Sequence, residues 1–209
     1  MNGDNQSSID TLQEIRSIMN RSSRFLSLSG WSGIWAGCVA LIGAFIARLW
    51  ISAYYVAYDT RNSYSITAFV SLRNRLFILG IIVLVLAILG GYLFTFRKSK
   101  QEGESIWNSV TKKLLINLFI PILAGGAFVI AFLFNSEWMY ITAACLVFYG
   151  LALINAAKYT VSDIHYLGVC EVALGCISLF VPNYGLYFWA LGFGVLHIFY
   201  GIIMWVKYK

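Results

Sequence analysis

Three ionisable side chains lie inside long apolar runs of the sequence: Arg48, Glu171 and His197. Such residues are costly in a bilayer, and they mark ion pathways, ligand sites or polar contacts between helices. Arg48 stands near the outer end of its run, so its long side chain is expected to reach the membrane interface. Glu171 and His197 are therefore the first candidates for chemistry.

Glu171 and His197 are expected at equal depth on neighbouring helices. Glu171 lies about eight residues into one apolar run, or roughly 12 Å at the rise of an α-helix. His197 lies about nine residues from the end of the last run, roughly 13 Å deep. Pro182-Asn183-Tyr184-Gly185 is a strong turn signal between the two runs. The spacing thus predicts an antiparallel helix pair with these two side chains in contact.

Three interpretations of this candidate polar pair stay open. The first is a structural hydrogen bond between helices, and the second is a proton-linked or ligand-binding site. The third is a metal site completed by Cys38 or Cys170, which fall at similar depth. The short ligand spacings typical of metal sites do not occur, so no metal-binding residue is assigned.

Signatures of catalysis are missing from the sequence. It contains no G-x-S-x-G, no H-E-x-x-H and no glycine-rich phosphate loop. All four Asp residues lie outside the apolar runs. We therefore expect no enzyme, no catalytic residue and no cofactor-binding residue.

Composition identifies an integral membrane protein. Of the 209 residues, 60% are hydrophobic and only 11% are charged, against about 25% charged in soluble domains. The net charge of +6 does not indicate nucleic acid, because the basic residues separate apolar runs, as bilayer topology requires. The four cysteines lie inside apolar runs, which does not favour a disulfide framework.

The fold class expected is an all-α integral membrane protein, a six-transmembrane-helix bundle at 29–209. Each span needs roughly 20 mostly apolar residues. The expected spans are 29–54, 76–96, 114–134, 138–157, 164–181 and 186–206, and the longest loop is expected at 55–74. Small residues crowd the first span and predict close helix packing there.

Residues 1–28 are expected to form a separate cytoplasmic or interfacial segment. Within it, 8–27 has apolar residues at helical spacing, opposite a charged face. This pattern predicts an amphipathic helix, either lying in the membrane interface or docked on the bundle.

The distribution of basic residues predicts the orientation. With the N-terminus inside, eleven of the fifteen Lys and Arg residues fall on the cytoplasmic side, and Arg61, Arg73 and Arg75 fall outside. This is a positive-inside bias. Both termini are therefore expected in the cytoplasm.

Two stretches resemble a known family: residues 14–30 (EIRSIMNRSSRFLSLSG) and residues 191–204 (LGFGVLHIFYGIIM), which Lys207 and Tyr208 follow. Both are similar to an uncharacterised family of small multi-span bacterial inner-membrane proteins. The likeness extends over most of the chain, including residues 167–171. It implies a multi-pass protein of the inner (plasma) membrane and adds nothing about mechanism.

Two functions follow as expectations from this reading. The leading one is a structural or regulatory membrane protein that acts through contacts with lipids, a protein partner or a second copy of itself. The alternative is a small transporter or channel, linked to protons through Glu171 and His197.

Overall fold

The computed structural model describes residues 29–61, 65–101, 103 and 107–207, and this part consists of helices joined by short turns, with no strand. Six helices are long and apolar enough to cross a membrane, as the composition predicts. The amphipathic helix expected within residues 8–27 lies outside the described residues. The elements are α2 (Gly30–Arg61), α3 (Ile66–Gln101), α4 (Ser109–Phe134), α5 (Ile141–Ala156), α6 (Asp163–Phe180), α7 (Gly185–Trp189), the π-helix η4 (Ala190–Leu196) and α8 (His197–Lys207).

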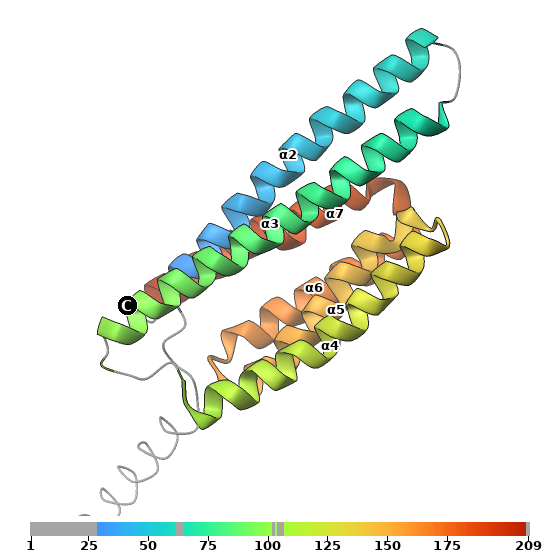
Figure 1. Ribbon diagram of the computed structural model, residues 1–209. Coiled ribbons are helices and arrows are strands. Elements are labelled where there is room, and N and C mark those ends of the chain that lie inside the picture. The colour runs from blue at the N-terminus through green and yellow to red at the C-terminus, as the bar shows by residue number, and fades with distance from the viewer. Residues whose placement is uncertain (1–28, 62–64, 102, 104–106, 208–209) are drawn as a thin grey trace, which may run out of the picture.

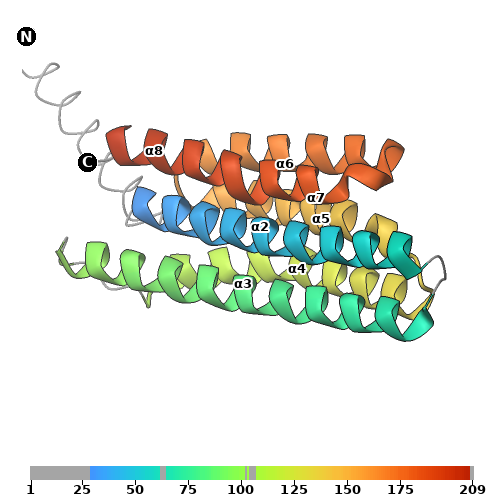
Figure 2. The same cartoon turned by 90° about the horizontal axis from the view of Figure 1, so that it is seen from above.

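The six spans form two layers of three helices. In one layer α2 lies between α3 and the last span, which consists of α7, η4 and α8; in the other, α5 lies between α4 and α6 (Figure 2). The last span also contacts α5 and α6, and it closes one edge of the pair of layers. At the opposite edge α3 and α4 make little contact, and Figure 1 shows the layers diverging there.

Glycines bring the central helices unusually close, as the small residues of the first span predict. A Cβ added to Gly37 would lie 2.6 Å from the carbonyl oxygen of Gly194. A Cβ on Gly150 would lie 2.6 Å from the carbonyl oxygen of Gly168. Because these neighbours are backbone atoms, α2 with the last span, and α5 with α6, can pack at these distances only with glycine present.

The first hairpin is longer than expected, because its first helix does not end at 54 and its second does not begin at 76. α2 has 32 residues and continues to Arg61, while α3 has 36 residues and begins at Ile66. Residues 55–61 and 66–74 are therefore helical, and the long loop expected at 55–74 does not exist. The charged residues there do not end a helix whose backbone bonds are already satisfied internally.

The ends of the other spans agree with expectation within a few residues. α4 begins at Ser109, five residues early, where the Asn108 side chain accepts a hydrogen bond from the Thr111 amide at 2.8 Å. It continues through Pro121 and ends in a tight turn with Ser136 at φ +63°. Short 3₁₀ turns, Trp138–Tyr140 and Ala157–Tyr159, flank α5.

The last span differs in kind from the expected continuous α-helix over 186–206. Its middle is the π-helix η4, seven residues long. The span makes its most extensive contact with α2. Its contact with α6 is smaller, although the 182–185 turn connects it to α6. It thus belongs to the layer of the first two spans and meets the other layer with its opposite face.

Candidate functional site

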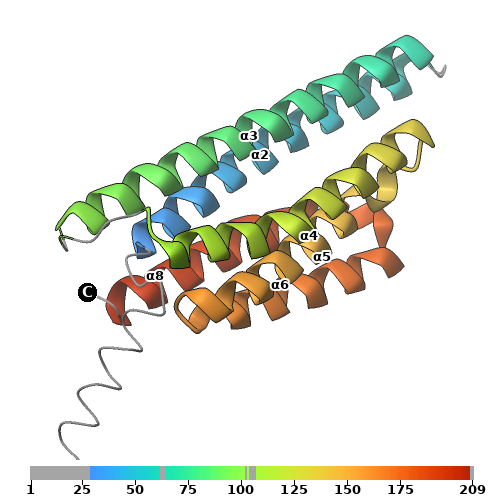
Figure 3. The same ribbon diagram turned by 60° about the horizontal axis from the view of Figure 1, so that its bottom comes forward.

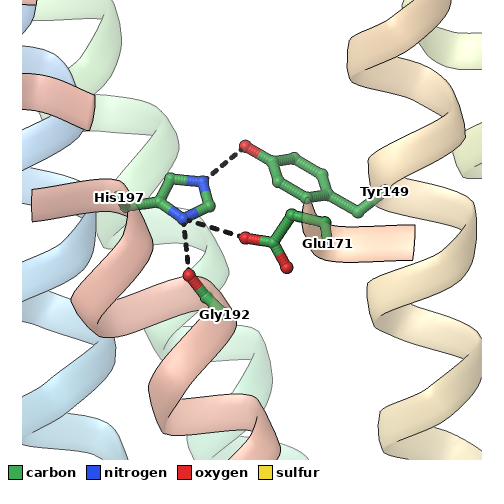
Figure 4. A network of polar contacts seen from close by, with 4 residues as sticks. All are labelled: Tyr149, Glu171, Gly192 and His197. Atoms are coloured by element: carbon green, nitrogen blue, oxygen red, sulfur yellow. Dashed lines mark hydrogen bonds and ion pairs between the residues drawn. The ribbon is translucent and has the colours of Figure 1, made fainter. Parts of the chain in front are cut away.

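The polar pair predicted from helix depth lies at the closed edge, where the two layers meet. The His197 Nδ1 atom is 3.4 Å from the Glu171 Oε1 atom. Glu171 is fully buried on α6, and His197 is buried at the start of α8. The structure therefore brings these two residues together across the joint between the layers, as Figure 4 shows.

Two further groups hold His197, and sequence reasoning missed both. The Nδ1 atom is 3.0 Å from the carbonyl oxygen of Gly192, and the Nε2 atom is 2.8 Å from the hydroxyl of Tyr149. Because a carbonyl oxygen only accepts, Nδ1 must donate. In a neutral ring Nε2 then accepts from Tyr149, and a second proton on Nε2 would reverse that bond.

Tyr149 had a detectable signal in the sequence. It lies eight residues before Ala157, the expected inner end of its span, which puts it at the same depth of roughly 12 Å as Glu171. Its ring also stacks on that of His197, with centroids 5.4 Å apart. The Gly192 carbonyl had no such signal, because its position depends on the π-helix.

Glu171 is the unusual member of the cluster. Neither of its carboxyl oxygens has a hydrogen-bond partner among the described residues, although both are buried. The 3.4 Å approach of His197 does not supply one, because the Nδ1 proton points to Gly192. A buried polar group left without a hydrogen bond costs on the order of 1–3 kcal/mol. Such groups are rare, and each calls for an explanation.

The space for the Glu171 carboxyl exists because η4 contains Gly192. A Cβ at this position would lie 2.5 Å from Glu171 Oε2 and equally close to a methyl group of Leu146. Leu146 itself is fully buried. The ring of Phe193 lies 5.2 Å from that of Tyr149 and encloses the cluster further. The site is thus a small polar cluster sealed by apolar and aromatic groups.

The remaining residues considered from the sequence lie apart from the cluster. Arg48 and Cys38 are exposed on α2, and Cys170 is half-buried on α6 beside Glu171 in the chain. Within the described ranges, no group of three His, Cys, Asp or Glu side chains is arranged to hold a metal ion. The contacts of the cluster are therefore those between Tyr149, Glu171, Gly192 and His197.

An ion pair also joins the two layers at the end of the closed edge where α8 ends and α6 begins. The Lys207 ammonium, at the end of α8, donates to both carboxylate oxygens of Asp163 at 3.0 Å, and Asp163 begins α6. Three features thus fasten the last span to the other layer: apolar packing, the buried cluster and this pair.

Comparison with known proteins adds no relative to this description. No protein family model, curated protein or solved structure matches the chain.

Proposed function

We propose that the protein is a non-catalytic membrane protein, structural or regulatory, that works through contacts with other proteins or lipids. The observation that carries this proposal is the projecting end of the α2–α3 hairpin (Figures 1 and 3). Arg73 stacks on Trp138, which stands at the end of the other layer. The seven residues from Ile66 to Leu72 therefore extend roughly 10 Å beyond that layer.

The projecting end carries apolar side chains that the rest of the protein leaves uncovered. Tyr55, Val56 and Ile66 are each at least 60% exposed, and Tyr58 is exposed as well. α2 and α3 would measure about 48 and 54 Å, against a hydrocarbon core of about 30 Å, so these residues extend past the lipid. Exposed apolar patches outside lipid mark interaction surfaces, and tyrosine is enriched in such surfaces.

A photo-crosslinking amino acid can test this surface in cells. Placed at Tyr58 in the full chain, it is expected to give a discrete crosslinked product, either with another protein or with a second copy. The matched control is Ile88, which is also exposed, on α3, but stands at membrane depth. Crosslinking to lipid alone from both positions, with a strictly monomeric protein in mild detergent, would contradict the proposal.

We place the protein in the inner (plasma) membrane with both termini in the cytoplasm. The eleven-to-three distribution of basic residues supports this orientation. Reporter fusions after Lys100 and after Lys209 should both read cytoplasmic, and a fusion at Asn62 should read external. A reversed reading at any of the three would overturn this orientation.

A second candidate function, a small proton-linked transporter or channel, is favoured by the buried cluster. The Glu171 carboxyl, which has no hydrogen-bond partner among the described residues, stands beside a histidine whose second nitrogen contacts a hydroxyl. Proton relays in membranes use such groups. π-helical turns are frequent at functional sites. In vesicles with an imposed pH gradient, the protein would then carry protons inward, and Glu171→Gln would stop the flux. Equal flux with the variant, or no flux above protein-free vesicles, would remove this candidate.

A further inference from the structure

A groove separates α3 from α4 at the open edge, at the end that carries Trp138. Its volume is about 390 Å³. It is lined by Arg73, Asn74 and Phe77 of α3, by Ile130, Leu133 and Phe134 of α4, and by Trp138. The groove therefore has one polar end and two apolar walls contributed by different layers.

Beyond the residues that line the groove, α3 and α4 each carry a glycine with open space beside it. Seven residues beyond Arg73, on the same face of α3, is Gly80, and one turn before Ile130 on α4 is Gly126. A Cβ at either glycine would meet nothing within 4 Å. Since α3 and α4 make little contact with each other, a slender apolar chain can lie between them along this line.

The polar end carries an uncompensated positive charge. The Arg73 guanidinium lies 4.6 Å from the centre of the Trp138 ring, and its Nε donates to the Asn74 side-chain oxygen at 3.4 Å. No carboxylate of the described part of the chain lies within ion-pair distance of it. Stacking orients the planar guanidinium, whose remaining N–H groups suit the oxygens of a phosphate.

We infer that this groove binds one anionic phospholipid from the membrane leaflet at the Trp138 end, with its phosphate on Arg73 and an acyl chain along Phe77, Ile130 and Leu133. The charge of the headgroup complements Arg73, and the apolar walls suit an acyl chain. A peptide is a poorer occupant, because its backbone would need hydrogen-bond partners that these walls do not offer. The inference is independent of any partner of the projecting hairpin.

Quenching of tryptophan fluorescence by brominated lipids tests the site in the full chain. The protein is reconstituted in phosphatidylcholine vesicles with increasing brominated phosphatidylglycerol or, separately, brominated phosphatidylcholine. The Trp138 signal is the difference between the wild type and Trp138→Phe. We expect a preference for the anionic lipid of about fivefold, the factor that one cation contributes at an anionic membrane surface.

Three variants distinguish a specific lipid-binding site from general attraction of anionic lipid by surface charge. Arg73→Gln should reduce the preference to about one, while Arg75→Gln, which removes the same charge two residues away on the surface of α3, should keep it. Ile130→Phe leaves Arg73 in place but narrows the groove, so it should weaken quenching by both lipids. Circular dichroism verifies that each variant is folded.

Several results would overturn the inference. Equal quenching by both lipids in the wild type would exclude an anionic headgroup at Arg73. A loss of preference in Arg75→Gln as large as in Arg73→Gln would indicate general surface charge. Unchanged quenching in Ile130→Phe would show that no acyl chain occupies the groove, even if Arg73→Gln fails to fold.

Discussion

The closed and open edges of the two layers are built from similar pairs of side chains. At the closed edge the ring of His197 stacks on that of Tyr149, and at the open edge the Arg73 guanidinium stacks on Trp138. In the first pair His197 is buried and Tyr149 is half-buried, but the second pair lines a groove. Stacking of a basic group on an aromatic ring is therefore not what brings the two layers into contact.

The difference lies in what surrounds each pair. At the closed edge Gly192 lets a carboxyl and a leucine approach to where a Cβ would stand, and the layers touch. At the open edge the faces at Gly80 and Gly126 meet nothing. A glycine therefore leads to close packing only where another helix lies against it. Substitutions at matched positions of the two edges can measure how much that packing contributes.

The largest effect is expected at Gly192. Gly192→Leu would push side-chain atoms into Glu171 and Leu146, which are both fully buried and cannot move aside. Overpacking of this kind costs about 1–3 kcal/mol. The matched control, Gly126→Leu at the open edge, should stay within about 0.5 kcal/mol, as surface substitutions do. Thermal unfolding in detergent compares them, and equal losses would show that the open edge is packed in solution.

Tyr149→Phe should have the next largest effect. It removes the hydroxyl that contacts His197 Nε2 and leaves this buried nitrogen without its partner. Hydrogen bonds between membrane helices average about 0.6 kcal/mol, with a maximum near 1.7, so we expect a loss of about 1 kcal/mol in the free energy of unfolding. In a double-mutant cycle with His197→Leu the loss should not be additive, and simple additivity would argue against the contact.

Lys207→Gln should cost less than Tyr149→Phe. The ion pair with Asp163 joins the layers, but half of the Lys207 side chain is exposed, at 52%. Exposed pairs contribute about 0.2–1 kcal/mol and are screened by salt. The difference between Lys207→Gln and the wild type should therefore shrink at high ionic strength. If it persists there, the pair is held more firmly than an exposed ion pair.

The smallest effect is expected at Glu171, although it is the most deeply buried charged residue. His197 keeps Gly192 and Tyr149 as partners without it, and the carboxyl itself has no hydrogen bond to lose within the part of the chain that the structure describes. Glu171→Gln keeps a buried polar side chain of the same size and should therefore change the free energy of unfolding by less than about 0.6 kcal/mol, the average for a bond between membrane helices. A larger loss would reveal a bonded carboxyl. Intact stability with a lost cellular phenotype would assign Glu171 a functional role.

The sequence predicts the apolar part of this fold better than its polar and projecting parts. Hydropathy finds six spans because each needs an apolar run long enough to cross the hydrocarbon core of the bilayer. It misses residues 55–61 and 66–74, because a helix can continue through polar and charged residues while its backbone hydrogen bonds are satisfied internally. Equal depth predicts that Glu171 and His197 are in contact. Depth does not tell in which direction a side chain faces around its helix axis. That is why Tyr149, at the same depth on α5, was not recognised as the third member.

The π-helix has a consequence for the phase of the last span. A π-turn contains one residue more than an α-turn, so residues beyond it are rotated by about 100°, one α-helical step. In an uninterrupted α-helix of the same sequence, His197 would be turned by about a quarter turn away from Tyr149. Deleting a single residue between Ala190 and Leu196 should restore an α-helix and keep His197 in its present direction, because the π-helix absorbs that one residue. The one residue absorbed in η4 thus sets the direction in which all later residues of the span face around the helix axis, including Lys207.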